Sequence, residues 1–271
     1  MLKIGIVGCG AIGSQICRSI DADSDDIQIY AVSDHNIDFV CALKEKLKHM
    51  KPEFLTIEEM VEHVDLVVES ASQKAVSQII PPALKAGCDV MIMSIGALAD
   101  SDFREYIYGL ARNYNCRIYL PSGSITGIDG LKSAMSGEIY SVTLTTKKPP
   151  SGLTGAPYIV DNEIDLERIE SETLIFEGNA AKAVESFPAN VNVAATLSIA
   201  GIGFERTKVR IIADPHVIRN IHEIEVEGEF GKFTTRTENI PSPTNPKTSY
   251  LASLSAIATL KKIANPLQIG T

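Results

Sequence analysis

A glycine-rich turn near the start of the chain constrains the fold more than any other feature. The string Gly8-Cys9-Gly10-Ala11-Ile12-Gly13 fits G-x-G-x-x-G and lies between an apolar run, Leu2–Val7, and a segment with helical spacing, Ala11–Ile20. In such turns the first glycine permits the tight turn, the second lets backbone approach a pyrophosphate, and the third lets the helix lie close to the strand. The helix N-terminus adds amide donors. The turn therefore predicts a dinucleotide site that includes Gly8, Gly10, Ala11, Ile12 and Gly13.

An acidic residue follows the next apolar run at the distance that this kind of turn requires. Asp34 comes after Ile27–Val32 and 21 residues past Gly13, where a carboxylate can accept hydrogen bonds from an adenosine ribose. Its charge repels a 2′-phosphate, and the neighbours His35 and Asn36 offer no guanidinium to receive one. NAD is therefore the expected cofactor, with NADP left open. A turn that binds nothing is disfavoured, because strand, turn, helix, strand and acid all occur in order.

Strands and helices alternate through the first half of the chain. The apolar runs are 2–7, 27–32, 65–68, 89–93 and 116–120, and the helical segments between them are 11–20, 38–47, 74–86 and 102–113. Short apolar strands separated by amphipathic helices are typical of a parallel sheet covered on both faces. We therefore expect an α/β fold, with a Rossmann-type doubly wound parallel sheet in a dinucleotide-binding domain over 1–121.

The pattern changes after Pro121. Half-buried strands are predicted at 138–146, 207–212, 222–227 and 232–237, with helices at 179–185 and 189–200. Asn245 is placed as an N-cap and Pro246 as the first helical residue of a final helix. We expect a second α+β domain over 122–245, with a mostly antiparallel sheet, and a C-terminal helix over 246–271 that completes the first domain.

The composition excludes several classes of protein. The 271 residues are 45% hydrophobic, too apolar to stay disordered, and the formal net charge of −9 opposes a nucleic-acid surface. No apolar run is long enough to span a membrane. All five cysteines lie at or before Cys116 without CxxC spacing, which predicts reduced thiols and a cytoplasmic protein. The histidines show no ligand spacing, so we expect no metal.

A histidine of the second domain is the candidate catalytic residue. Strand alternation puts Asn220 and His222 on one face and Glu223, Glu225 and Glu227 on the other. The imidazole therefore points toward an interior or a cleft, where its ordinary pKa suits general acid or base catalysis. Asn220 is a candidate substrate ligand on the same face. A core histidine that bonds a backbone carbonyl is the alternative, and composition alone favours it.

Two asparagines and a serine are further candidates for ligand binding. Asn190 and Asn192 lie at the start of an otherwise apolar helix; Asn190 is explained as a cap, whereas Asn192, further in, is the better ligand candidate. Ser124 lies in the loop after the strand at 116–120. Ligands of open parallel sheets bind beyond the carboxyl ends of the strands, so this loop is expected to reach the nicotinamide.

Cations of the second half are candidate carboxylate ligands. Arg206, Lys208 and Arg210 alternate along one strand face, and Lys247 lies at the start of the predicted final helix. Each of them can meet a carboxylate. A solvated strand face is the competing interpretation of the alternating cations.

Over essentially its whole length the chain resembles the L-aspartate dehydrogenases. The specific strings are 187–194, Ala213-Asp214-Pro215, Asn220-Ile221-His222, Pro241-Ser242-Pro243 and 245–249. The resemblance implies that His222 is catalytic and that Asn192 contacts the cofactor. A family alanine that also contacts the cofactor corresponds to Ser124 here, so this position departs from the family.

The resemblance also implies a reaction. L-aspartate would give up a hydride from Cα to NAD(P)+, and the iminoaspartate would hydrolyse to oxaloacetate and ammonia or feed NAD biosynthesis. A homodimer is expected as well. The alternatives are a two-domain reductase of the dihydrodipicolinate-reductase type and a non-catalytic NAD-binding regulator. An acyl-phosphate-dependent aldehyde dehydrogenase is disfavoured, because no cysteine follows Cys116.

Overall fold

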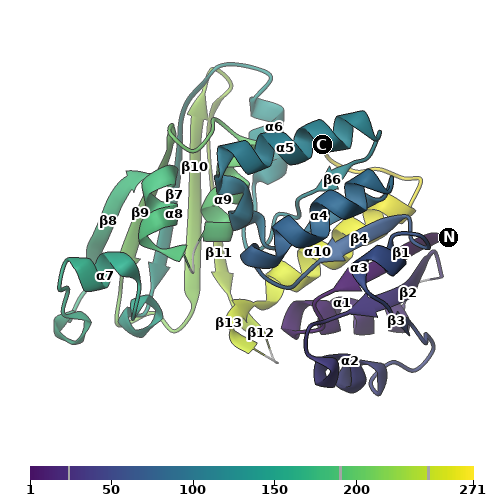
Figure 1. Cartoon of the computed structure of the whole chain (residues 1–271). Helices are drawn as coiled ribbons and strands as arrows, with labels where there is room; N and C mark the ends of the chain where they lie inside the picture. The colour runs from purple at the N-terminus through teal and green to yellow at the C-terminus, as the bar shows by residue number, and fades with distance from the viewer. Residues whose placement is uncertain (24, 189–190, 243–244) are drawn as a thin grey trace. The chain divides into compact units, whose positions relative to one another are not determined.

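Two compact units make up the chain, shown by a computed structural model in Figure 1. The structure describes residues 1–23, 25–188, 191–242 and 245–271. Unit 1 comprises Met1–Gly123 and Ala252–Ile269, and unit 2 comprises Ser124–Leu251 and Gly270–Thr271. Within the described residues, no helix is both long and apolar enough to cross a membrane.

Unit 1 is built on a six-stranded sheet in which every pair of neighbours is parallel. The strands are β1 (Leu2–Val7), β2 (Ile27–Ser33), β3 (Glu53–Phe54), β4 (Leu66–Glu69), β5 (Asp89–Ile92) and β6 (Ile118–Tyr119), in the order β3-β2-β1-β4-β5-β6. The strand order reverses between β1 and β4, so their carboxyl ends form the switch point where such sheets bind ligands. The predicted doubly wound sheet is confirmed; the two-residue β3 was not predicted.

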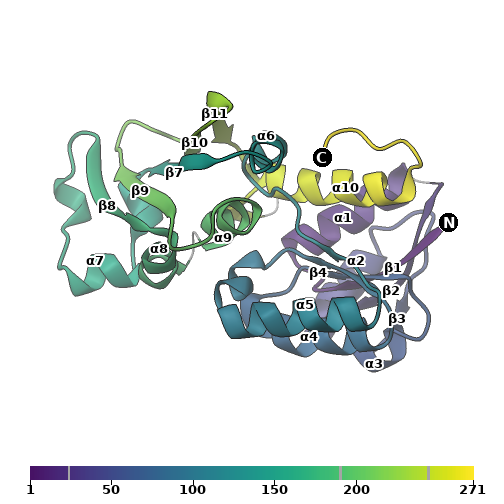
Figure 2. The same cartoon turned by 90° about the horizontal axis from the view of Figure 1, so that it is seen from above.

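Helices cover both faces of this sheet. They are α1 (Ala11–Ala22), α2 (Ile37–Lys44), α3 (Ile57–Met60), α4 (Gln73–Lys85), the 3₁₀ turn η1 (Ile95–Ala99), α5 (Ser101–Asn113) and α10 (Tyr250–Ala264). Figure 2 shows α1 and α10 on one face and α4 and α5 on the other. Ile257 and Leu260 of α10 share a hydrophobic cluster with Ile4 and Ile6 of β1. The last helix thus supplies part of the core around the first strand.

The final helix differs from the prediction at both ends. It begins at Tyr250 rather than Pro246, because Asn245–Ser249 form strand β13, which pairs antiparallel with β12 (Pro241–Ser242). The Tyr250 N–H donates to the carbonyl of Ile240 at 3.0 Å. The helix ends at Ala264, two residues before Pro266, since a proline disfavours helical conformation in the residue before it.

Unit 2 contains a five-stranded mixed sheet in the order β11-β10-β7-β9-β8. Its strands are β7 (Ile139–Lys148), β8 (Thr173–Asn179), β9 (Thr207–Ala213), β10 (Asn220–Gly228) and β11 (Gly231–Asn239). The pair β7–β9 is parallel and the other pairs are antiparallel, which confirms a mostly antiparallel sheet. The carboxyl ends of β7 and β9 and the start of β10 therefore meet at one edge.

One face of this second sheet is buried under helices. The helical segments are α6 (Ile128–Ala134), η2 (Pro150–Leu153), α7 (Pro157–Asp161), η3 (Leu166–Arg168), α8 (Ala180–Ser186) and α9 (Val191–Ala200). Ala183 of α8 and Leu197 of α9 join Leu144, Val209 and Ile224 of the sheet in one hydrophobic cluster. Strand β8 and helices α6 and α7 were not predicted. The buried face is the one that carries His222.

Candidate active site

Glycines at 8, 10 and 13 shape the turn between β1 and α1. Gly8 adopts a φ of +100°, a left-handed conformation that favours glycine. A Cβ on Gly13 would overlap the carbonyl oxygen of Gly8, so only glycine allows α1 to lie this close to β1. A Cβ on Gly10 would instead meet open space, and no side chain caps the N-terminus of α1. Ala11 and Ile12 begin this helix. The N-terminus of α1, which lacks a side-chain cap, is the kind of helix end that can bind an anion.

Asp34 is tied directly to this turn. Its side chain is only 5% exposed, and its Oδ2 accepts the backbone N–H of Cys9 at 2.7 Å. Its Oδ1 accepts the N–H of Asn36 at 2.9 Å and lies 3.0 Å from Nδ1 of His35. These bonds fix a carboxylate at the carboxyl end of β2, beside the second residue of the glycine string.

In unit 2, His222 is held by its neighbour across the sheet. It pairs with Thr146 in the β7–β10 register, and Oγ1 of Thr146 lies 3.0 Å from Nδ1 of the ring. The residue is 6% exposed. Burial, and the nearby charge of Lys148, lower the pKa of His222 to about 3. The ring is therefore neutral at pH 7, whereas the sequence suggested an imidazole that titrates near neutrality.

Lys148 is a second functional candidate on this face, and it was not predicted. It is 9% exposed, and burial lowers the pKa of its ammonium to about 8. The predicted strand stopped at Thr146, two residues too early. Continuing the alternation to the true end of β7 puts Lys148 on the same face as Thr146 and His222.

Other predicted residues are placed around this edge of unit 2. Asn220 is half-buried at the start of β10. Ser124 is 8% exposed, and its carbonyl accepts bonds from Oγ1 of Thr237 at 3.2 Å and Nδ2 of Asn239 at 3.0 Å. Ser124 is thus anchored to β11 through its backbone, an arrangement available to any residue at this position.

The remaining candidates lie on helix α9, on β13 and on the strands. Asn192 is exposed in the first turn of α9, and its carbonyl accepts Oγ1 of Thr196 at 2.7 Å. Asn190 is outside the described residues. Lys247 lies on strand β13, not at the start of a helix as predicted.

The alternating cations of β9 are bonded within unit 2. Lys208 and Arg210 both contact Glu177 of β8, at 2.8 and 3.0 Å, with about half of each side chain exposed. Arg206 donates to the carbonyl of Ile139 at 3.0 Å. These partners favour the solvated strand face over a carboxylate-binding role. Across the described residues, no group of three His, Cys, Asp or Glu side chains could hold a metal ion.

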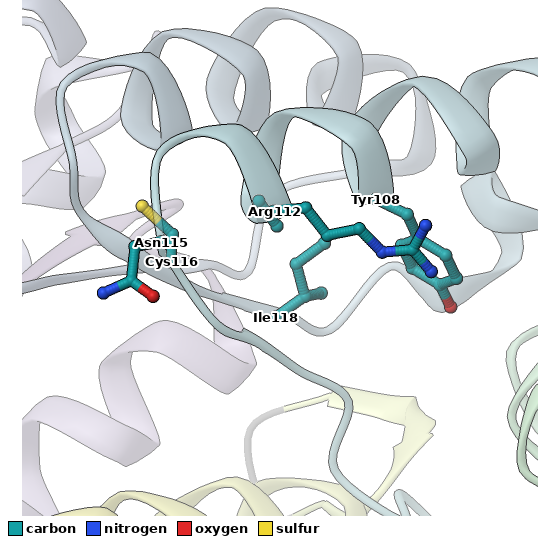
Figure 3. Close-up of a pocket in the computed structure, with 6 residues that line it drawn as sticks. Tyr108, Arg112, Asn115, Cys116 and Ile118 are labelled. Atoms are coloured by element: carbon teal, nitrogen blue, oxygen red, sulfur yellow. The ribbon is translucent and has the colours of Figure 1, made fainter.

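A pocket of about 480 Å³ lies in unit 1 at the end of α5. Figure 3 shows Arg112 extended along the helix toward Tyr108, with Asn115 and Cys116 at the turn into β6. None of the predicted site residues lines it. The chemistry-bearing groups described above are elsewhere, at the glycine turn and on the His222 face.

A dinucleotide turn at the switch point of a parallel sheet defines the class: this chain is an NAD-dependent oxidoreductase. Residues 8–121 match a family model described as homoserine dehydrogenase, NAD binding domain, and residues 129–263 match one described as aspartate dehydrogenase, C-terminal. L-aspartate dehydrogenases from Methanosarcina mazei and Nitrosopumilus maritimus are 63% and 43% identical over all of both chains. The chain belongs to the L-aspartate dehydrogenase family.

Solved structures agree with this assignment. Aspartate dehydrogenase from Thermotoga maritima matches with a TM-score of 0.76 and 29% identity, covering all of both chains. A scyllo-inositol dehydrogenase from Lactobacillus casei, solved with NAD(H) and scyllo-inositol, matches with a TM-score of 0.58 and 18% identity, over 99% of this chain and 91% of that one. At that identity the likeness shows the fold alone.

Proposed function

We propose that the protein oxidises L-aspartate with NAD+ to iminoaspartate, which hydrolyses to oxaloacetate and ammonia or enters NAD biosynthesis. The observation that carries the proposal is the buried His222–Thr146 pair, which lies within the part of the chain that matches the aspartate dehydrogenase model. The full-length relatives named L-aspartate dehydrogenase support the choice of substrate.

In this proposal the residues of unit 1 bind and orient the cofactor. The open space at Gly10 and the free amides of α1 receive the pyrophosphate, and Asp34 accepts hydrogen bonds from the ribose. NAD+, when bound, accepts the hydride that leaves Cα of the substrate. NADP+ can replace it to the extent that the Asp34 carboxylate tolerates a 2′-phosphate.

His222 acts on water rather than on the substrate ammonium. With a pKa of about 3, the ring is a poor acceptor for a proton from an ammonium group, whose pKa is about 8 to 10. A water molecule that has added to a C=N carbon is far more acidic, so a weakly basic imidazole can accept its proton. If Nδ1–H donates to Oγ1 of Thr146, the lone pair of Nε2 is available for this step.

The test is absorbance at 340 nm with NAD+ and a panel of amino acids. Growth of the signal with L-aspartate alone supports the substrate. Oxaloacetate and ammonia, each assayed with a coupled enzyme, should form in equal amounts with NADH. No NADH with any amino acid would contradict the proposal and revive a non-catalytic NAD-binding regulator.

A further inference from the structure

Lys148 is a buried cation on the face that carries His222. Along β7 the even-numbered residues Val142, Leu144, Thr146 and Lys148 are buried. Thr146 holds the imidazole of His222, and Lys148 is the next residue on the same face, close enough for its charge to lower the pKa of the ring. Burial of a lysine is costly, and ionisable groups with perturbed pKa values cluster at functional sites.

The fold fixes the position of this lysine. β7 is the central strand of the sheet, and Lys148 pairs with Ala213 of β9. Its carbonyl accepts the N–H of Asp214 at 2.8 Å. A Cβ on Gly152 of η2 would lie 3.6 Å from Cβ and Cδ of Lys148, so this turn covers the aliphatic stem. Pairing with β9 therefore fixes the backbone of Lys148, and the η2 turn packs against its aliphatic stem.

The preceding residue provides an internal comparison. Lys147 lies on the opposite face of the same strand, and its Nζ contacts Oε2 of Glu172 at 2.5 Å and Oδ2 of Asp214 at 3.9 Å. Its ammonium is paired near the surface. Lys148 lies on the opposite, buried face, together with Thr146 and His222.

Titratable groups near Lys148 come from the neighbouring strands and from both faces of the sheet. His222 comes from β10, and Asp214 follows β9 with its carboxylate turned toward Lys147. Lys147 and Glu172 lie on the other face. Burial lowers the pKa of Lys148 to about 8, so both protonation states are populated near that pH, as proton transfer from an amino acid requires.

We propose that the amine of Lys148 accepts the proton of the substrate ammonium before hydride transfer; this rests on the proposed oxidation of L-aspartate. The neutral Nζ forms an N–H bond as the N–H bond of the substrate breaks, which gives Lys148-NH₃⁺ and a neutral substrate amine. The amine lone pair then forms the C=N bond as the hydride leaves Cα for NAD+. The substrate loses two electrons, the nicotinamide gains them, and the released proton stays on Lys148.

Two roles thus separate on one face. Lys148 takes the proton that an alkyl ammonium can give to another amine, and His222 takes the proton from the more acidic water adduct.

The test compares Lys148→Arg with Lys147→Arg in the full-length protein. Arginine keeps the positive charge but does not give up its proton. We expect kcat/KM of the native enzyme to rise up to about pH 8. In Lys148→Arg we expect kcat to fall about 10²- to 10⁴-fold, with the Kd for NADH unchanged and with loss of this rise. Lys147→Arg should keep the native kcat and pH profile. A Lys148→Arg variant with native kcat, or one altered only in KM for aspartate, would overturn the proposal.

Chemical rescue separates a proton acceptor from a structural lysine. In Lys148→Ala, added methylamine or ethylamine should restore part of kcat, whereas tetramethylammonium, which has no lone pair, should not. If no amine restores activity to a variant that still binds NADH, the proton-acceptor role is refuted. If the native enzyme oxidises a different amino acid and not L-aspartate, the proposed substrate is wrong. The Lys148 variants are then assayed with that amino acid, and the same outcomes decide the role of Lys148. If the native enzyme oxidises none, both proposals fail.

Discussion

The two units place their functional groups by opposite means. Unit 1 does so by omitting side chains: glycines at 8, 10 and 13 shape the turn at which we propose that the pyrophosphate binds. Unit 2 does so by burying polar side chains, His222 and Lys148, on one face of a sheet, although such side chains are usually exposed to solvent. The first arrangement depends on sequence spacing and the second on strand register. They should therefore respond differently to substitution.

The largest effect is expected at Gly13. In Gly13→Ala the new methyl group must displace the carbonyl of Gly8, so the free energy of unfolding should fall by about 3 kcal/mol or more and NADH binding should be lost. Gly10→Ala adds a methyl group in open space, so stability should stay native while NADH binding weakens. Circular dichroism melts and NADH fluorescence titrations measure the two quantities. Equal destabilisation of both variants would contradict this account of the turn.

His222→Ala tests the other unit. Loss of the imidazole should lower kcat about 10²- to 10⁴-fold, or about 3 to 5 kcal/mol in transition-state free energy. The Kd for NADH should stay native, because the glycine turn is untouched. Steady-state assays with L-aspartate give kcat, and unchanged turnover would remove His222 from the mechanism.

Lys148→Met should stabilise the protein while it abolishes turnover. The folded-state pKa of about 8 lies below the unfolded value of 10.5, so the native lysine costs about 3 kcal/mol at pH 7. This cost is constant below about pH 7. It shrinks between pH 8 and 10.5, because the folded lysine is then neutral and the unfolded lysine releases its proton on folding more easily as the pH rises. The gain from Lys148→Met in urea unfolding should shrink over the same range.

Lys147→Met is the matched control for that measurement. Its ammonium is paired with Glu172, so its removal should bring no gain in stability at any pH. A gain equal to that of Lys148→Met would show that the buried position is not the cause.

The smallest effect concerns cofactor choice. Asp34→Asn keeps an oxygen that can accept the Cys9 N–H but removes the negative charge that repels a 2′-phosphate. The ratio of kcat/KM for NAD+ to that for NADP+ should fall by about tenfold, which corresponds to 1.4 kcal/mol. An unchanged ratio would mean that Asp34 serves only to fix the turn.

The contrast between the units also explains what could be predicted from the sequence. The glycine turn and Asp34 are local features with fixed spacing, and the apolar strands of unit 1 are buried on both faces. Such features are readable without a structure. In unit 2, alternation correctly placed His222 on the buried face.

The elements that were missed have physical reasons. Lys148 was overlooked because a lysine at a strand end is usually solvated, and only the register with β9 carries the strand that far. The Asn-Pro signal at 245–246 predicted a helix start. Instead, pairing with β12 places this segment in strand β13, against the local preference for a helix N-terminus. The parallel β7–β9 pair joins strands about sixty residues apart, so no local pattern reveals it.

The discontinuity of unit 1 has a consequence for synthesis. The chain leaves this unit after Gly123 and returns at Ala252, and α10 contributes Ile257 and Leu260 to the cluster around β1. While the ribosome is making unit 2, helix α10 is therefore still missing from one face of the cofactor-binding sheet. Since domains tend to fold as their chain emerges, residues 124–251 of unit 2 are available for folding before the unit that begins the chain receives its last helix.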